Sequence, residues 1–302
     1  AINAYTGSRP LEGDILYNGN LDAWMQFANS LKIKYLIRIS GKVNVSSELQ
    51  TLFTDGNYIK NNAENAIFDF TNTEPNSFRL AQLRVGDFNN FVLSETMEEI
   101  LINLNDARIT TFFRPFSNST SNKFNGLING IDASSTSIVL SDYSLAGNAF
   151  REDTSSLDAN FMTAWETSFL LAEAGEKGLI NANAETLYNL GVTQAFDYWN
   201  TNLPANYLTG NANFNAIGKT PLEQIITQKW IASVIYGYEG WIEYRRTGFP
   251  ALKKVSASLN NGNIPVRMPY PAEEATLNQE NYKVAETTTN GNSLDVKVWW
   301  NE

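Results

Sequence analysis

The strongest constraint on the fold is a helix signal that begins at Thr220. Thr220-Pro-Leu-Glu223 supplies an N-cap threonine, a first-turn proline and a glutamate three residues after the cap. Ile226, Trp230 and Val234 follow at four-residue steps, so they fall on one face of a helix. This segment therefore predicts a helix with one buried face, and such a face requires other helices or a sheet to cover it.

Other segments show apolar residues at the same three- and four-residue steps. Asn20 is placed to cap a helix over residues 21–40. Gly191 and Ala195, within 184–200, are small enough to let two helices approach closely. Paired helices of this length are typical of tetratricopeptide units, although no strict 34-residue repeat is present. The additional helices are predicted over residues 21–40, 95–104, 161–178, 184–200 and 238–246.

Two long spans lack helical periodicity. Residues 112–160 are rich in Ser, Asn, Gly and Asp, and residues 250–302 contain several prolines, so both are predicted to be irregular. Short strands are predicted at 66–70 and 137–140. The sequence thus predicts a mainly α fold of tetratricopeptide-like helical hairpins with long irregular loops and a few short strands. One domain over 1–302 is expected, with a helical scaffold at 21–40, 161–200 and 220–246.

The composition excludes several function classes. The chain has no histidine and no cysteine, which removes Ser-His-Asp catalysis, His-bound zinc, thiolate metal sites and disulfides. Its net charge of −10 repels phosphate backbones, so nucleic acid is not an expected partner. No run of about 18 apolar residues is present, so no membrane-spanning helix is predicted.

Carboxylates leave an enzymatic alternative open. A helical glycoside hydrolase needs two carboxylates that flank the scissile bond. Glu98–Glu99, Glu152–Asp153 and Glu273–Glu274 are adjacent pairs, and neighbours on one element rarely face each other across a cleft. Asp142, Asp153 and Asp158 offer oxygen ligands but lack the spacing of a calcium loop, so no metal or other cofactor is predicted. A tetratricopeptide-type scaffold that binds a protein or peptide is a second alternative.

The stretch WIEYRRTGFPAL, residues 241–252, admits two interpretations. Arg245 and Arg246 beside aromatic residues can bind an anion or a sugar. They can also hold neighbouring segments together while the aromatic rings fill the core. We favour the second interpretation, because nothing else in the stretch indicates a pocket.

Six segments in order resemble the SusD/RagB family of outer-membrane nutrient-binding lipoproteins. The segment at 104–116 is similar to the family's Asp-Pro-Arg segment, with Ala107 where proline is usual. The stretch QKWIASVIYGYEGWIEYRRTGFPAL (228–252) resembles the family's C-terminal motif. The others are GDILYNGNLDAWMQFANSLKIKYLIRIS (13–40), FMTAWETSFLLAEAGEKG (161–178), LYNLGVTQAFDYW (187–199) and IPVRMPYPAEEATLNQENY (264–282), and KVWW (297–300) closes the chain.

The resemblance covers roughly the C-terminal two-thirds of the family fold, so the N-terminal part is expected to be missing. It implies a surface-exposed, non-catalytic lipoprotein of the cell outer membrane that binds oligosaccharide or, in some branches, peptide. It also implies a partner, a TonB-dependent transporter of the SusC type. The membrane association would be through a lipid anchor that this chain lacks.

The resemblance also suggests where ligand binds, since the family's irregular loops carry its site. Aromatic rings stack on the apolar faces of sugars, and polar groups bind the hydroxyls. We expect Tyr143 or Phe150 to show its ring on an exposed concave surface. The predicted ligand-binding residues are Arg114, Phe116, Asn118, Tyr143, Phe150 and Arg151, and the predicted structural residues are Trp230, Trp241, Arg245, Arg246, Arg267 and Tyr270.

Overall fold

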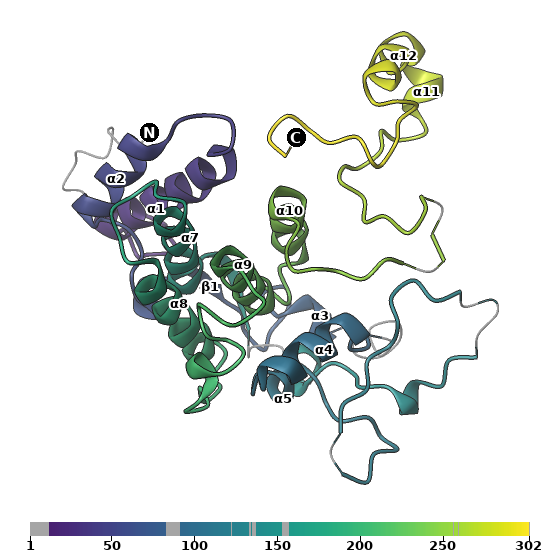
Figure 1. Ribbon diagram of the computed structural model, residues 1–302, viewed down its shortest axis with the longest axis horizontal. Helices are drawn as coiled ribbons and strands as arrows, with labels where there is room; N and C mark the ends of the chain where they lie inside the picture. The colour runs from purple at the N-terminus through teal and green to yellow at the C-terminus, as the bar shows by residue number, and fades with distance from the viewer. Residues whose placement is uncertain are drawn as a thin grey trace.

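The computed structural model shows a mainly helical protein with one two-stranded sheet in the described part of the chain (Figure 1). It describes residues 12–82, 91–121, 123–132, 134, 137–152, 157–255, 257–258 and 260–301. The predicted fold class is confirmed. Among these residues, no helix combines the length and the apolar character that crossing a bilayer requires.

A helix is present in each segment where the sequence predicted one, and further short helices occur that were not predicted. The helices are α1 (Leu21–Ile39), α2 (Ser46–Asp55), α3 (Arg79–Gln82), α4 (Glu95–Leu104), α5 (Ile109–Phe112), α6 (Asn148–Arg151), α7 (Ala164–Glu176), α8 (Ala184–Tyr198), α9 (Pro221–Ala232), α10 (Gly237–Thr247), α11 (Glu274–Leu277) and α12 (Gln279–Thr288). The strands β1 (Ala66–Asp69) and β2 (Asp158–Met162) pair in antiparallel fashion.

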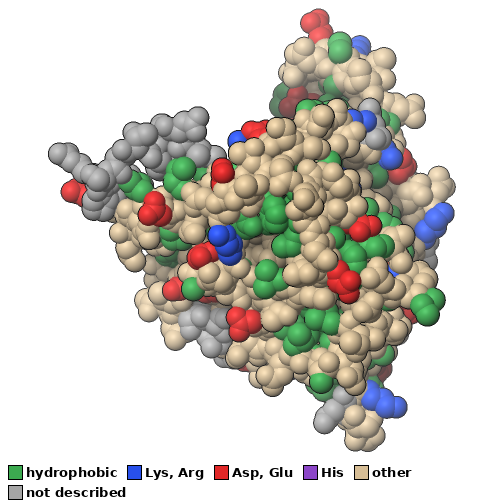
Figure 2. Space-filling model, turned by 60° about the vertical axis from the view of Figure 1, so that its left-hand side comes forward, with side chains coloured by type: hydrophobic (Ala, Val, Ile, Leu, Met, Phe, Trp, Pro, Cys, Tyr) green, Lys and Arg blue, Asp and Glu red, His purple; other side chains and the backbone are tan. Residues whose placement is uncertain are grey.

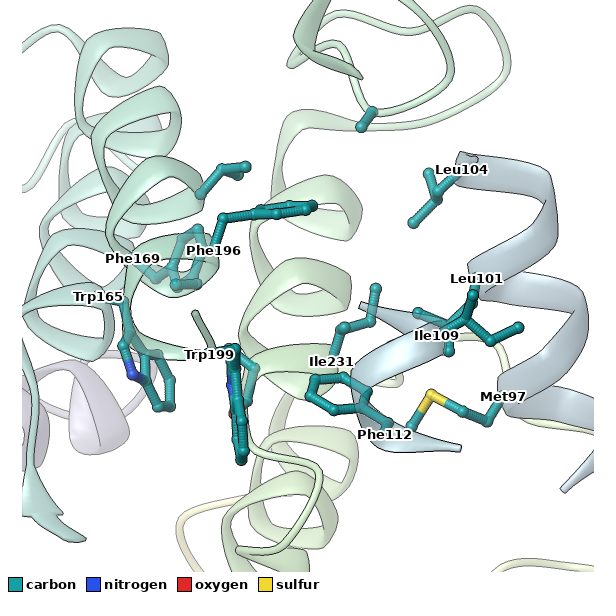
Figure 3. Close-up of a cluster of buried hydrophobic side chains, with 14 of the residues drawn as sticks. Met97, Leu101, Leu104, Ile109, Phe112, Trp165, Phe169, Phe196, Trp199 and Ile231 are labelled. Carbon is teal, nitrogen blue, oxygen red and sulfur yellow. The ribbon is translucent and has the colours of Figure 1, made fainter. Parts of the chain in front are cut away.

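The hairpin of α7 and α8 forms the centre of the scaffold, with α1 and α9 packed against α7. Gly191 makes the close approach possible, because a Cβ atom there would lie 2.8 Å from the ring of Phe169. Figure 3 shows the core that results, where Trp165, Phe169 and Phe196 face side chains from α4, α5 and α9. The small residues thus have the role that the sequence predicted for them.

The capping signals of the sequence are present in the structure. The Thr220 hydroxyl accepts a hydrogen bond from the backbone N–H of Glu223 at 3.1 Å and begins α9. Helix α10 ends at Gly248, whose φ of +77° is a left-handed conformation that glycine adopts at low cost. Gly240 lies against Trp230, where a Cβ atom would be 2.9 Å from the indole, and this contact joins α9 to α10.

Three local predictions differ from the structure. Residues 137–140 form no strand, and the chain turns there into a 3-10 helix over Leu140–Asp142. Strand β2 is absent from the predictions because only its pairing with the distant β1 defines it. Helices α11 and α12 lie within 250–302, a span predicted to be irregular. In Figure 1 they project from the helical body on an extended arm.

Charged side chains are buried where α1, α7, α9 and α10 meet. Lys34 of α1 pairs with Glu166 of α7 at 3.0 Å. Arg246 of α10 donates to Glu173 of α7 at 2.7 Å and also pairs with Glu243 on its own helix. Lys229 lies between Glu166 and Glu243, at 3.4 and 3.5 Å, and is 2% exposed. This buried ion network fixes α10 to the scaffold, because removal of one partner leaves an unpaired buried charge.

Candidate functional site

A cavity of about 620 Å³ lies where the loop 112–160 meets the C-terminal end of α8. Its wall combines aromatic rings, amides, a guanidinium group and a carboxyl group, and such a mixture suits a polar ligand that has apolar faces. The lining residues are Thr110, Thr111, Phe113, Arg114, Pro115, Gly147, Asn148, Ala149, Leu157, Asp158, Tyr198, Trp199 and Asn200.

Backbone hydrogen bonds hold the two ends of the loop 112–160 together at this place. The N–H of Arg114 donates to the carbonyl of Leu145 at 2.9 Å, and the N–H of Gly147 donates to the carbonyl of Phe112 at 2.8 Å. Gly147 is required by the close approach, because a Cβ atom there would lie 2.4 Å from the carbonyl oxygen of Thr111. The rings of Phe112 and Phe150 contact Trp199 and so place the loop against the end of α8.

Aromatic side chains form the inner wall. Trp199 is 4% exposed, its indole N–H donates to the carbonyl of Ala232 at 3.0 Å, and its ring meets that of Phe112 edge-on at 4.9 Å. Phe113 and Tyr198 are half-buried and also line the cavity. These two rings are the ones that can present an apolar surface to a ligand, while Trp199 supports them from behind.

Polar side chains complete the wall. Asn148 begins α6 and is exposed, and Asn200 follows α8 in a left-handed conformation with φ of +48°. Arg114 is half-buried, and in the described part of the chain no carboxylate forms an ion pair with it. The amides and the guanidinium group supply hydrogen-bond donors that hydroxyl or carboxylate oxygens can accept.

The carboxyl group in the cavity wall belongs to Asp158 and has an unusually high pKa. It stands directly opposite Asp69 in the pairing of β1 with β2. Burial and the neighbouring charge of Asp69 raise the pKa of Asp158 from 3.8 to about 6. The protonated form of Asp158 is therefore favoured at mildly acidic pH.

We expect this pair to make stability depend on pH. Because the pKa of Asp158 is raised in the folded protein, its contribution to stability is fully present below pH 3.8 and is lost as pH rises through about 6. In urea unfolding, wild type should lose stability relative to Asp158→Asn between pH 4 and pH 7. The exposed Asp142→Asn serves as the matched control. A constant difference between wild type and Asp158→Asn across this range contradicts the assignment.

Comparison with known proteins identifies the family. Residues 1–271 match the SusD-like family model that is described as starch-binding associating with outer membrane. The chain belongs to the SusD-like family. The resemblance inferred from the sequence is thereby confirmed. No curated protein matches the chain.

Solved structures of SusD-like proteins share the fold. A SusD homolog from Parabacteroides distasonis matches with a TM-score of 0.85 and 22% identity, over 100% of this chain and 71% of that one. A SusD homolog from Bacteroides uniformis matches with a TM-score of 0.79 and 26% identity, over 100% and 70%. A chitin-binding protein matches with a TM-score of 0.81 and 21% identity, over 99% and 72%.

Of the six predicted ligand-binding residues of this SusD-like chain, Arg114 alone lines the cavity. Phe150 is 5% exposed and packs against Phe112 and Trp199, so the expectation that it shows its ring at the surface is wrong. Its burial has a simple cause, since α6 places the ring against the end of α8, where apolar area leaves water.

The other four predicted ligand-binding residues lie elsewhere in the loop. The Asn118 amide donates to the Asp142 carboxylate at 2.6 Å and thus ties two turns of the loop together. Phe116 and Tyr143 are half-buried outside the cavity. Arg151 lies beside Glu152, at 3.8 Å. A ligand role for these four residues stays a prediction.

The predicted structural residues make contacts that suit a framework. Arg245 lies over the rings of Trp241 and Trp300, at 4.3 and 4.7 Å. The Trp241 indole donates to the carbonyl of Pro265 at 2.6 Å. Arg267 donates to the carbonyl of Ser293 at 2.8 Å and lies over Tyr270. These contacts, with the Arg246 ion pairs and the contact of Trp230 with Gly240, support the structural interpretation of the SusD-like motif.

The carboxylate pairs Glu98–Glu99 and Glu273–Glu274 do not line the cavity. Glu98 accepts from the N–H of Gly126 at 2.7 Å, and Glu99 pairs with Lys253 at 2.6 Å. Glu273 and Glu274 stand at the start of α11 on the projecting arm. Asp153 lies outside the described residues. The calcium ligands considered from the sequence also separate, since Asp142 bonds Asn118 while Asp158 faces Asp69.

Proposed function

We propose that this SusD-like protein is a non-catalytic glycan-binding protein of the cell surface and that the 620 Å³ cavity is its oligosaccharide site. The observation that carries the proposal is the composition of the cavity wall in a chain of this family. Phe113 and Tyr198 offer ring surfaces, and Asn148, Asn200 and Arg114 surround them with hydrogen-bond donors. A sugar ring matches this arrangement, since it has an apolar face and a rim of hydroxyls.

The family supports the wider role. Its description associates starch binding with the outer membrane, and one solved relative is a chitin-binding protein. The protein would deliver its oligosaccharide to a TonB-dependent outer-membrane transporter of the SusC type. It would be held at the outer surface as a lipoprotein.

Binding to a panel of immobilised oligosaccharides tests the proposal. We expect at least one glycan to bind with a Kd between micromolar and millimolar, because a few stacked rings supply only about 4–8 kcal/mol. The same glycan should stay intact on prolonged incubation, with no reducing ends released. Binding of peptides instead of any glycan contradicts the proposed ligand class. Release of sugar that one Asp or Glu substitution abolishes contradicts the non-catalytic assignment.

A further inference from the structure

Arg114 is a cation in the wall of the cavity that forms no ion pair with a described carboxylate. Its backbone is fixed by the hydrogen bond to Leu145, and its side chain lines the cavity. Among the described residues it forms no ion pair, whereas Arg38, Arg108 and Arg246 each pair with a carboxylate within the protein. A half-buried guanidinium group that forms an ion pair with no described carboxylate is suited to bind an anionic group of a ligand.

The neighbouring groups make the charged form of Arg114 less favourable. Burial lowers the pKa of Arg114, and the positive charge of Arg151 lowers it further, while Glu152 acts in the opposite direction. Two guanidinium groups are thus held near each other beside the cavity, and only Arg151 has Glu152 within ion-pair distance. An anion at Arg114 would relieve the repulsion between the two cations.

The position of Arg114 in the cavity wall is not explained by a generally basic protein surface. The chain has a net charge of −10, and acidic side chains are spread over the face shown in Figure 2. The carboxyl group of the wall belongs to Asp158, which faces Asp69 and has a pKa raised to about 6, so it carries less negative charge at mildly acidic pH. Below about pH 6 the wall therefore keeps the positive charge of Arg114 while Asp158 is mostly neutral.

We propose that the cavity takes an acidic sugar unit and that Arg114 pairs with the anionic group on its ring. This inference rests on the proposed function and adds the class of ligand to it. The guanidinium fork matches a carboxylate, as in a uronic acid, and also a sulfate ester, so the shared feature is an oxyanion beside a ring that can stack on Phe113 or Tyr198.

Paired ligands that differ only in charge test the inference. Oligogalacturonate and its methyl ester have the same rings and linkages, and the ester lacks the carboxylate. Sulfated oligosaccharides and their desulfated forms make the second pair, which distinguishes the two sources of the oxyanion. We expect one of the charged forms to bind at least about tenfold more tightly than its neutral counterpart, as loss of a charge-assisted pair predicts.

The variant Arg114→Gln assigns that preference to one residue. It should reduce the ratio of the two affinities to about one, while Arg114→Lys should keep part of it. Lys123→Gln removes the same charge from an exposed position of the same loop and should leave the ratio unchanged. The melting temperature of each variant shows whether the loop still folds.

The outcomes separate this inference from the proposed function. Equal binding of both members of each pair, or binding of neutral glycans alone, overturns the acidic ligand and leaves glycan binding in place. A charge preference that persists in Arg114→Gln overturns the role of Arg114. Absence of binding to every glycan, charged or neutral, contradicts both proposals.

Discussion

Replacing Arg246 with alanine should destabilise the protein by about 3–5 kcal/mol, the usual cost of breaking a buried ion pair by removing one partner. Arg246 pairs with Glu173 and Glu243, which are 1% and 4% exposed. Burial raises the pKa of Glu243, but Arg246 and Lys229 more than offset it and hold the carboxylate charged. Without Arg246, these two carboxylates remain buried but lose part of the positive charge that compensates them. Urea unfolding measures the loss.

Arg245→Ala is the matched control on the same helix. Arg245 is only partly buried and stacks on Trp241 and Trp300, and it forms no ion pair with a carboxylate among the described residues. Cation–π contacts at such sites contribute about 0.5–2 kcal/mol, so its loss should be clearly smaller. Equal losses in the two variants, or a larger loss in Arg245→Ala, contradict the buried ion network as the main attachment of α10.

Replacing Arg108 with methionine should also cost about 3–5 kcal/mol. Arg108 is fully buried, and its guanidinium donates to Asp106 at 2.6 Å and to Gln228 at 2.7 Å. It also lies 4.3 Å over the ring of Phe196 on α8. The Tyr207 hydroxyl and the backbone N–H of Arg108 donate to Asp106 at 2.5 and 3.0 Å, so the change leaves a buried carboxylate with two neutral donors and no cation.

A double variant distinguishes loss of the ion pair from loss of packing. Asp106→Leu combined with Arg108→Met removes both buried charges, and replacing a whole buried pair with apolar residues is often nearly neutral. We therefore expect the double variant to be more stable than either single variant in a double-mutant cycle. A double variant that loses the sum of the two single losses contradicts the ion pair as the source of the effect.

Helices could be predicted from the sequence where local signals define them. Asn20 and Thr220 cap α1 and α9 through their own side chains, and Gly248 ends α10 through its own backbone freedom. Strand β2 has no such local signal, since its pairing partner lies about ninety residues earlier in the chain. Arg108 was also missed as a core residue, because a buried arginine depends on Asp106 and Gln228 meeting it in three dimensions.

The candidate site could be predicted only in part. The loop 112–160 was recognised because it is long and rich in aromatics, and Arg114 lies in it. Tyr198 and Asn200 were not predicted as ligand-binding residues. They lie at the C-terminal end of a helix whose periodicity indicates only a scaffold element. Phe150 shows the limit of the argument from aromatic content, since the same side chain serves a core or a binding surface, and only the packing of α6 decides which.

Titration calorimetry with a glycan identified on the panel tests the central claim most directly. Asn148→Trp fills the cavity from an exposed position, and Phe161→Ala removes a 53% exposed aromatic that lines a different cavity near α1. With all melting temperatures preserved, we predict at least tenfold weaker binding in Asn148→Trp and wild-type affinity in Phe161→Ala. Wild-type affinity in Asn148→Trp together with lost binding in Phe161→Ala would contradict the assignment of the glycan site to the cavity between the loop 112–160 and α8.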